Sequence, residues 1–303
     1  MAIRNYTELK KAMGALPPVT VAVAAAADPE VIGGLKLAHE MGFVGTCIVT
    51  GDPAAIERCI AEAHDDPKLY EIVAAKNDAE AGMLAVQAVR EQGAKILVKG
   101  SLKSELYLKA ILDKERGIKA AQVLSNISIF EMPSYHKFLG VTDNAIIVAP
   151  TLEEKRAIIE NTRPLWKALG VDKPKTALLA AVETVSPKQP ATQDAAALVV
   201  MAMRGQIKDF IVDGPLGYDA AISAEAALTK GIKNSPVCGD PDLIIAPHLA
   251  TANSLGKSYK FHGSATWGGL VLGARVPAVL NSRSDDEQNR LNALLLARAM
   301  AAL

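Results

Sequence analysis

The chain has 303 residues, half of them hydrophobic, which is enough for a substantial core in one large or two ordinary domains. Basic and acidic residues number 33 each, so the chain lacks the charge footprint of a protein that binds nucleic acid or an anionic membrane. No apolar run approaches the roughly 20 residues that span a bilayer. The three cysteines, Cys47, Cys59 and Cys238, are odd in number and widely spaced. They favour reduced thiols in a cytoplasmic protein over a disulfide or zinc framework.

Strand, short polar turn and helix alternate along the chain. Thr151 and Glu154 form a capping-box pattern, which predicts a helix that begins there, and another helix is expected from Asp194. Alternating strands and helices imply parallel sheets, whose ligands lie at the carboxyl ends of the strands. The predicted strands span residues 19–24, 47–50, 95–98, 177–182, 210–212, 243–246 and 277–280.

One region breaks this alternation. Residues 127–130, 135–141 and 145–148 are short and strand-like, without long helices between them. They are expected to mark a crossover between two lobes. The predicted architecture is therefore two α/β lobes with mostly parallel sheets and an active site in the cleft between them.

Two nucleotide-binding motifs are absent from the sequence. Gly256-Lys257-Ser258 resembles the end of a P-loop, but Thr251 stands where that motif needs a glycine. The turn after the first strand is Ala24 to Ala27 and carries no GxGxxG pattern, which disfavours a nicotinamide dinucleotide.

The five histidines do not have the spacing of metal ligands, and no metal site is predicted. His39 and His64 lie in polar helical stretches and are expected to face solvent. His248 follows the strand 243–246 and could enter the cleft, although a structural role is favoured for it.

Ser282 and Arg283 follow the last predicted strand and bring a hydroxyl and a fixed cation to one place, which suits a phosphorylated substrate. Alternatively, Ser282 is a helix N-cap beside a solvated arginine, and both interpretations can hold together. Asp285, Asp286 and Glu287 are either surface acids that favour the first helical turn or include a base near the cleft.

Six segments, spread over nearly the whole chain, resemble one known family. They resemble the phosphate acetyltransferase and phosphate butyryltransferase family, most closely the butyryltransferase branch. The segments that carry the resemblance are residues 19–52, LVKGSLKSELYLKAIL (97–112), VTDNAIIVAP (141–150), LLAAVETVSPKQPATQDAAAL (178–198), VDGPLGYDAAIS (212–223) and LGARVPAVLNSR (272–283).

The resemblance implies transfer of an acyl group between coenzyme A and inorganic phosphate, without a metal or redox cofactor. It also implies a fold like that of isocitrate and isopropylmalate dehydrogenases, and a homodimer. The lobes would be residues 1–128 with 269–303, and residues 129–268.

Ser282 and Arg283 match the family's serine and arginine, which contact the reacting centre and neutralise phosphate. Asp286 is our choice for the aspartate that deprotonates the coenzyme A thiol, with Asp285 and Glu287 as rivals. The chain departs from the family at His248, at Ala252-Asn253 and at Lys260, where acetyltransferases have an arginine. The candidate substrate-binding residues are Asn253, Lys257, Lys260, Thr184 and Ser186.

The predicted function is a phosphate acyltransferase that acts on a short-chain acyl-CoA, with butyryl-CoA ahead of acetyl-CoA. The alternatives are a metal- and NAD-dependent dehydrogenase of similar fold and a non-catalytic protein that binds coenzyme A.

Overall fold

The computed structural model describes residues 2–282 and 285–303. The chain divides into two compact units, which are Met1–Asn5 with Gln122–Thr266 (unit 1) and Tyr6–Ala121 with Trp267–Leu303 (unit 2). Both units are α/β structures with mostly parallel strands, as the sequence predicted. The lobe boundaries given above stay a prediction.

Unit 2 contains a sheet with the strand order β3-β2-β1-β4-β11-β10. All of its neighbouring pairs are parallel except β10 with β11, which is antiparallel. Strand β11 is only two residues long, and it places the segment that follows it beside the carboxyl end of β4. The strands are β1 (Val19–Ala24), β2 (Val44–Gly51), β3 (Tyr70–Ala74), β4 (Ile96–Lys99), β10 (Thr266–Leu272) and β11 (Ala278–Val279).

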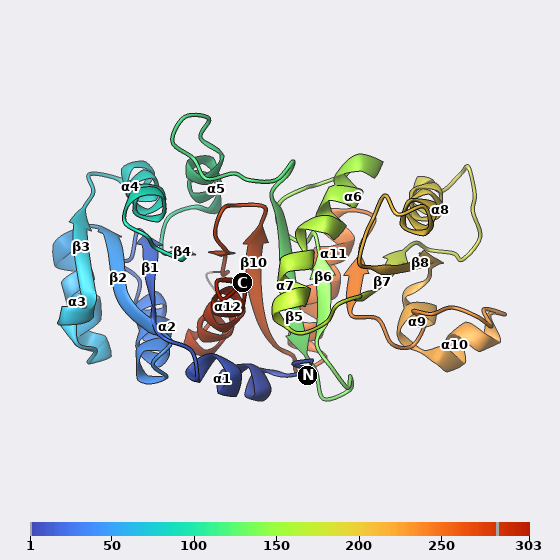
Figure 1. Ribbon diagram of the computed structural model, residues 1–303, viewed down its shortest axis with the longest axis horizontal. Coiled ribbons are helices and arrows are strands. Elements are labelled where there is room, and N and C mark those ends of the chain that lie inside the picture. The colour runs from blue at the N-terminus through green and yellow to red at the C-terminus, as the bar shows by residue number, and fades with distance from the viewer. Residues whose placement is uncertain (1, 283–284) are drawn as a thin grey trace. The chain divides into compact units, whose positions relative to one another are not determined.

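The helices of unit 2 cover both faces of this sheet. In Figure 1, α4 and α5 lie on one face and α2 and α12 on the other. The side chains of Asp28, Asp52 and Asn77 cap α2, α3 and α4, because short polar side chains satisfy the first free N–H groups of a helix. The helices are α1 (Tyr6–Gly14), α2 (Pro29–Glu40), α3 (Pro53–Ala63), the 3₁₀ turn η1 (Pro67–Leu69), α4 (Asp78–Glu91), α5 (Ser104–Leu112) and α12 (Glu287–Met300).

Unit 1 contains a sheet with the strand order β5-β6-β9-β7-β8. Strands β5 and β6 are antiparallel, whereas β6, β9, β7 and β8 run parallel to one another. The carboxyl ends of the parallel strands therefore share one edge of the sheet. The strands are β5 (Ser125–Glu131), β6 (Leu139–Thr142), β7 (Lys175–Leu179), β8 (Ile211–Leu216) and β9 (Leu243–Ile245).

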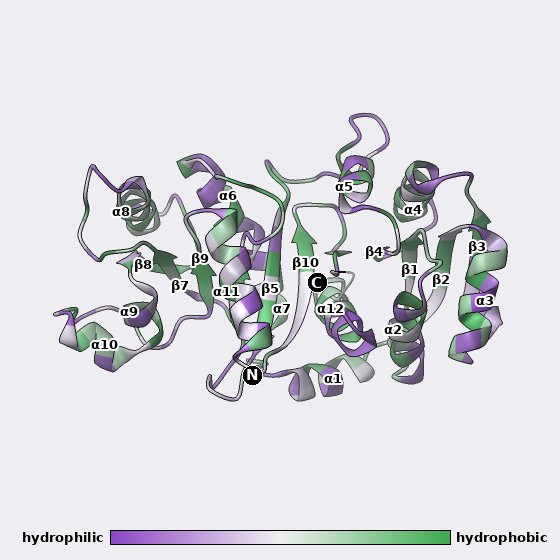
Figure 2. Ribbon diagram, turned by 180° about the vertical axis from the view of Figure 1, so that it is seen from behind, coloured by the Kyte–Doolittle hydropathy of each residue, from purple (hydrophilic) through white to green (hydrophobic). Residues whose placement is uncertain are grey.

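The helices of unit 1 also lie on both faces of its sheet. Helix α7 lies in front of β6 in Figure 1, and α11 lies in front of the strands in Figure 2, which shows the opposite side. The capping box predicted at Thr151 is confirmed, with reciprocal hydrogen bonds to Glu154. The helices are α6 (Leu152–Asn161), α7 (Arg163–Ala168), α8 (Pro190–Met203), α9 (Tyr218–Ile222), α10 (Ala224–Thr229) and α11 (Leu249–Phe261).

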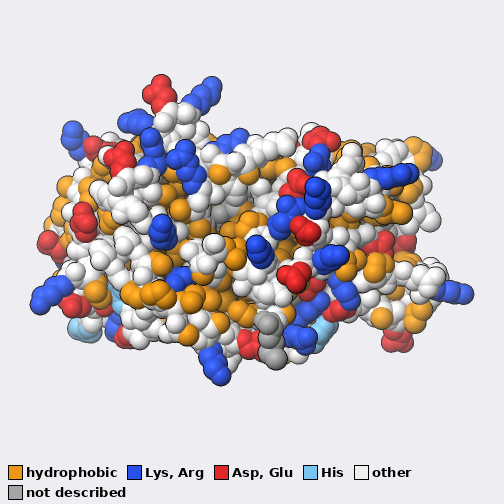
Figure 3. All heavy atoms as spheres, in the orientation of Figure 1, with side chains coloured by type: hydrophobic (Ala, Val, Ile, Leu, Met, Phe, Trp, Pro, Cys, Tyr) orange, Lys and Arg blue, Asp and Glu red, His pale blue; other side chains and the backbone are white. Residues whose placement is uncertain are grey.

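The parallel strands form the centre of each core. The residues of β4 and β9 are all buried, and the strands are coloured mostly as hydrophobic in Figure 2. Basic and acidic side chains are interspersed over the face drawn in Figure 3, which agrees with the zero net charge.

Several predicted elements differ from the structure, and one of them is β6, which begins at Leu139 and not at residue 135. Residues 145–148 form bends and no strand, because Asp143 accepts hydrogen bonds from the N–H groups of Ala145, Ile146 and Ile147 and holds them in a turn. Helix α8 begins at Pro190 and not at Asp194, since proline fits the first turn of a helix.

Candidate active site

The segment after β11 is held by one buried carboxylate. Asp285 is 1% exposed, and its Oδ2 accepts hydrogen bonds from the backbone N–H of Ser282 (2.8 Å) and from Nδ2 of Asn281 (3.2 Å). Asp285 also donates its own N–H to the carbonyl of Ser282 (3.1 Å). The backbone of Ser282 is thereby fixed while the residue itself is exposed. Arg283, the predicted cation of the pair, lies outside the described residues.

The acids after Ser282 do not have equal roles. Asp286, and not Ser282, is the N-cap of α12, because its Oδ1 accepts the N–H of Asn289 at 2.8 Å. Of the two interpretations left open for these acids, burial excludes a surface position for Asp285, whereas Glu287 is exposed in the first turn of α12. Asp286 is exposed as well, so a carboxylate lies four residues after Ser282 at the start of a helix.

Helix α12 is held against α2 by two glycines. A Cβ on Gly33 would lie 2.1 Å from Oε1 of Glu287, and one on Gly34 would lie 2.9 Å from Cβ of Arg290. Arg290 is buried and faces Asp28, the N-cap of α2, with 3.8 Å between Nη2 and Oδ2. This close packing fixes the start of α12, and therefore the two aspartates that precede it.

Three of the predicted substrate-binding residues lie on α11 of unit 1. Asn253, Lys257 and Lys260 have the spacing i, i+4, i+7, which places them on one face of the helix. Nδ2 of Asn253 donates to the carbonyl of Asn144 (3.0 Å), so this side chain ties α11 to the turn after β6. Lys257 is exposed, and Nζ of Lys260 lies 5.6 Å from the centre of the Phe261 ring.

His248 has the structural role that was favoured for it. It is the N-cap of α11, and its Nδ1 accepts the N–H of Thr251 at 3.4 Å.

Thr184 and Ser186 lie in the segment between β7 and α8. Thr184 is exposed. The N–H of Ser186 donates to Oγ1 of Thr192 (2.9 Å), and its Oγ accepts the N–H of Lys188 (3.3 Å). Ser186 therefore shapes the turn that leads into α8, and a substrate contact by either residue stays a prediction.

Sequence reasoning missed an ion-pair cluster in the segment that follows β7. Nζ of Lys230 lies 2.7 Å from Oε1 of Glu183 and 2.7 Å from Oδ1 of Asp219. The N–H of Gly217 also donates to Glu183 (3.2 Å), so these contacts join the segments after β7 and β8. The hydrogen bond that Lys230 donates holds the pKa of the Glu183 carboxyl below its ordinary value. No local pattern could have shown this cluster, since its members are far apart in the sequence.

A second missed cluster is buried in unit 2. Nδ1 of His39 lies 2.6 Å from Oδ2 of Asp65, which also accepts the hydroxyl of Tyr70 at 2.6 Å, and Nε2 of His39 lies 3.4 Å from Sγ of Cys47. The prediction that His39 faces solvent is wrong, because its side chain is 4% exposed and lies four residues after the buried Leu35. Burial raises the pKa of the Cys47 thiol, which is fully buried and is therefore not a nucleophile at neutral pH.

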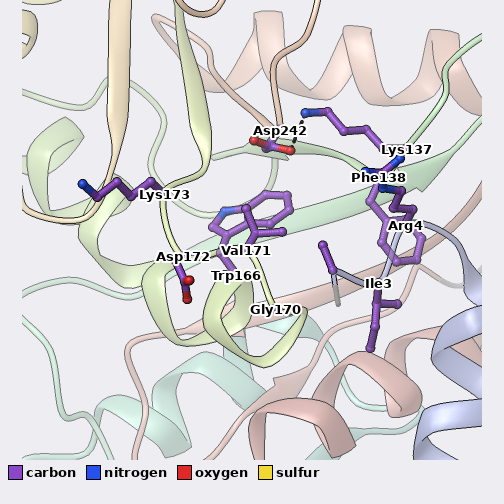
Figure 4. Close-up of a pocket in the computed structure, with 11 residues that line it drawn as sticks. Ile3, Arg4, Lys137, Phe138, Trp166, Gly170, Val171, Asp172, Lys173 and Asp242 are labelled. Atoms are coloured by element: carbon purple, nitrogen blue, oxygen red, sulfur yellow. Dashed lines mark ion pairs between the residues drawn. The ribbon is translucent and has the colours of Figure 1, made fainter.

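A cavity of about 310 Å³ lies in unit 1 at the opposite edge of the sheet from the turns described above (Figure 4). It is lined by the segments that precede β6, β7 and β9, and Trp166 and Phe138 form its apolar wall. Lys137 and Asp242 form an ion pair at 2.6 Å there. Ligands of parallel sheets bind at the carboxyl ends of strands, so this cavity is not the candidate active site.

Among residues 2–282 and 285–303, no group of three or more histidine, cysteine or acidic side chains is arranged to hold a metal ion. No helix in the described part of the chain combines the length and apolar character that crossing a membrane requires. The three cysteines are unpaired.

Comparison with known proteins identifies the family. Residues 54–298 match the family model described as phosphate acetyl/butaryl transferase. The chain belongs to that family.

Relatives in this family are similar over nearly their whole lengths. A probable phosphate butyryltransferase of Bacillus subtilis is 40% identical, over 92% of this chain and 92% of the relative. A phosphate acetyltransferase of Rhizobium meliloti is 39% identical, over 98% of this chain and 94% of the relative. A branched-chain phosphotransacylase from Enterococcus faecalis has a solved structure with a TM-score of 0.81 and 31% identity, over 93% of this chain and 99% of that one. Because the butyryltransferase and the acetyltransferase are almost equally similar, identity alone does not assign the acyl group.

Proposed function

We propose that this protein transfers a short-chain acyl group reversibly between coenzyme A and inorganic phosphate. In one direction, acyl-CoA and phosphate give acyl phosphate and free coenzyme A, and the other direction reverses this. The observation that carries the proposal is the exposed Ser282, whose backbone the buried Asp285 holds at the end of β11. Such a preorganised hydroxyl suits a carbonyl that gains negative charge during the reaction.

The chemistry assigns a role to each residue near this turn. Asp286 takes the proton of the coenzyme A thiol, since a thiol with a pKa near 8.5 needs help to form a thiolate at neutral pH. The thiolate attacks the carbonyl carbon of the acyl phosphate and forms a tetrahedral oxyanion. Ser282 donates a hydrogen bond to that oxyanion, and Arg283 neutralises the phosphate. The bond from carbon to the phosphate oxygen then breaks, and phosphate leaves with the electron pair.

Both substrates are bound together in this account, so no covalent intermediate with the enzyme is formed. Orienting two reactants in one site supplies much of the acceleration. The shared face of Lys257 and Lys260 on α11 supports a role in binding phosphate groups of the substrate. Asn253, Thr184 and Ser186 complete the proposed substrate-binding set.

We further propose that the reaction needs no redox cofactor, because no step transfers electrons to or from a carrier. We also propose that it needs no metal ion, with Arg283 neutralising the phosphate charge. The butyryl group is proposed as the preferred acyl group, ahead of the acetyl group. A homodimer in the cytoplasm is the proposed state of the protein.

Release of free thiol tests the function directly. The purified protein is incubated with acetyl-, butyryl- and isobutyryl-CoA, with and without phosphate, and thiol release is followed with a chromogenic disulfide. Release that depends on phosphate and is fastest with butyryl-CoA is the expected result. Absence of phosphate-dependent release with every acyl chain would refute the proposal, and release without phosphate would indicate a hydrolase.

A further inference from the structure

Lys99 is a buried ammonium at the carboxyl end of β4. The residue is 5% exposed, and its Nζ donates to the carbonyl of Gly100 at 3.1 Å. Because Gly100 is the first residue after the strand, this hydrogen bond places the ammonium at the carboxyl edge of the sheet. Buried ionisable groups at the carboxyl edge of a parallel sheet often belong to functional sites.

The register of the sheet places Lys99 beside the Ser282 segment. Val98 pairs with Val279, so Lys99 lies opposite Leu280. Neighbouring strands lie about 4.8 Å apart, and two residues of extended chain span roughly 6.6 Å. Ser282 is two residues beyond Leu280. At these spacings, one ligand can contact both Ser282 and the ammonium of Lys99.

Alternation along the neighbouring strands directs Lys99 and Leu280 to one face of the sheet. Val98, Val279 and Asn281 line one small cavity with residues of α2 and α12, so their side chains point to the same side. Side chains alternate along an extended segment, which directs Lys99 and Leu280 to the opposite side. The next alternate position after Leu280 is Ser282.

The loops around this ammonium consist of small residues. Gly100 and Ser101 donate their N–H groups to the carbonyls of Ala24 and Ala25 (both 2.8 Å), so two loops lie backbone to backbone. A Cβ on Gly100 would lie 2.0 Å from the carbonyl oxygen of Ala25, which excludes any other residue there. Gly100 and Ala24 to Ala26 are uncharged, so the charge at the end of β4 itself is that of Lys99.

We infer that Lys99 binds an oxygen of the transferred phosphate, as inorganic phosphate in one direction and as acyl phosphate in the other. This inference rests on the proposed function and adds a residue to its phosphate-binding set. The ammonium keeps its proton and stabilises the phosphate as the carbon–oxygen bond forms or breaks. A lysine suits this task as a compact point charge.

Replacement of the lysine by methionine tests the inference. Lys99→Met keeps an unbranched side chain without the charge, and Lys109→Met is the control, since Lys109 makes the same charge change at an exposed position of α5. We expect Lys99→Met to raise KM for phosphate by at least about 10-fold, as loss of a charge-assisted hydrogen bond does. KM for acyl-CoA should stay within about threefold, and Lys109→Met should match the parent.

Thermal unfolding with and without phosphate gives a second measurement, independent of turnover. Phosphate should raise the unfolding midpoint of the parent and of Lys99→Arg, but not of Lys99→Met or the shorter Lys99→Gln. A KM for phosphate in Lys99→Met within twofold of the parent would overturn the inference, and so would equal stabilisation of all four proteins by phosphate. Should the parent bind phosphate but transfer no acyl group, the proposed function fails while the role of Lys99 in binding phosphate stands.

Discussion

The carboxylate of Asp285 accepts the backbone N–H of Ser282 at 2.8 Å, so a buried acid fixes the backbone of an exposed serine. The same oxygen accepts the side chain of Asn281. Asp285 is therefore a positioning residue in this account, and Ser282 is the residue that contacts the substrate.

Asp285→Ala tests the positioning role. Removing the carboxylate leaves the N–H of Ser282 and Nδ2 of Asn281 without this acceptor, and we expect a loss of about 2 kcal/mol in the free energy of unfolding. The value of kcat should fall as well, because Ser282 loses its fixed position. Urea unfolding and steady-state kinetics check both effects. A variant with the stability and kcat of the parent would show that the hydrogen bonds do not hold the turn.

Asp286→Asn separates helix capping from catalysis. Asparagine caps helices about as well as aspartate, so the unfolding free energy should change by less than about 0.5 kcal/mol. As the proposed base, Asp286 should nevertheless contribute about 10²-fold or more to kcat. Glu287→Gln is the matched control, since Glu287 is the next exposed acid along the chain. Unchanged turnover in Asp286→Asn, with loss in Glu287→Gln, would move the base to Glu287.

Gly268→Ala tests the packing of β10 against α12. A Cβ at this position would lie 2.7 Å from the backbone N of Ala293 and 2.9 Å from the carbonyl carbon of Asn292, and backbone atoms cannot move aside as flexible side chains can. We expect a loss of about 1–3 kcal/mol in unfolding free energy. Gly14→Ala is the control, because its Cβ would make only an ordinary contact at 3.7 Å. Equal stability of the two variants would contradict the packing described here.

Asp65→Asn tests the buried cluster of unit 2. Burial alone would raise the pKa of Asp65, but hydrogen bonds from Tyr70 and His39 together lower it below its ordinary value of 3.8. A carboxyl with a lowered pKa stabilises the fold at neutral pH, and this contribution is lost as the pH falls below 3.8 and through the folded pKa.

We therefore expect Asp65→Asn to lower the free energy of unfolding by about 2 kcal/mol at pH 7 and by distinctly less near pH 3. Chemical unfolding measures both values. Asp52→Asn is the control, because asparagine can replace the exposed N-cap of α3 at either pH. A cost that is independent of pH would show that the charge of Asp65 does not stabilise the cluster.

Elements with a strong local signal were predictable from the sequence. The first strand has the predicted bounds, Val19–Ala24, because a buried strand of a parallel sheet is a continuous apolar run. The capping box at Thr151 carries its own signature as well.

The details of the candidate site were less predictable, because they depend on contacts between distant segments. An acidic run after Ser282 suggests a solvated helix start. Asp285 is nevertheless buried, and its carboxylate accepts hydrogen bonds from Asn281 and Ser282. Likewise, His39 appeared polar and exposed, although its partners Asp65 and Tyr70 come from a later turn and strand. Lys99 gave no signal in the sequence, since only the pairing of β4 with β11 brings it beside the Ser282 segment.

The central claim is that the hydroxyl of Ser282 stabilises the reacting carbonyl. The most direct test compares kcat of the parent and Ser282→Ala with butyryl-CoA and phosphate, with unfolding midpoints measured alongside. We predict a fall in kcat of about 10²- to 10³-fold at an unchanged midpoint, which is the usual effect of losing one oxyanion donor. A Ser282→Ala variant that keeps kcat within threefold of the parent would contradict the account.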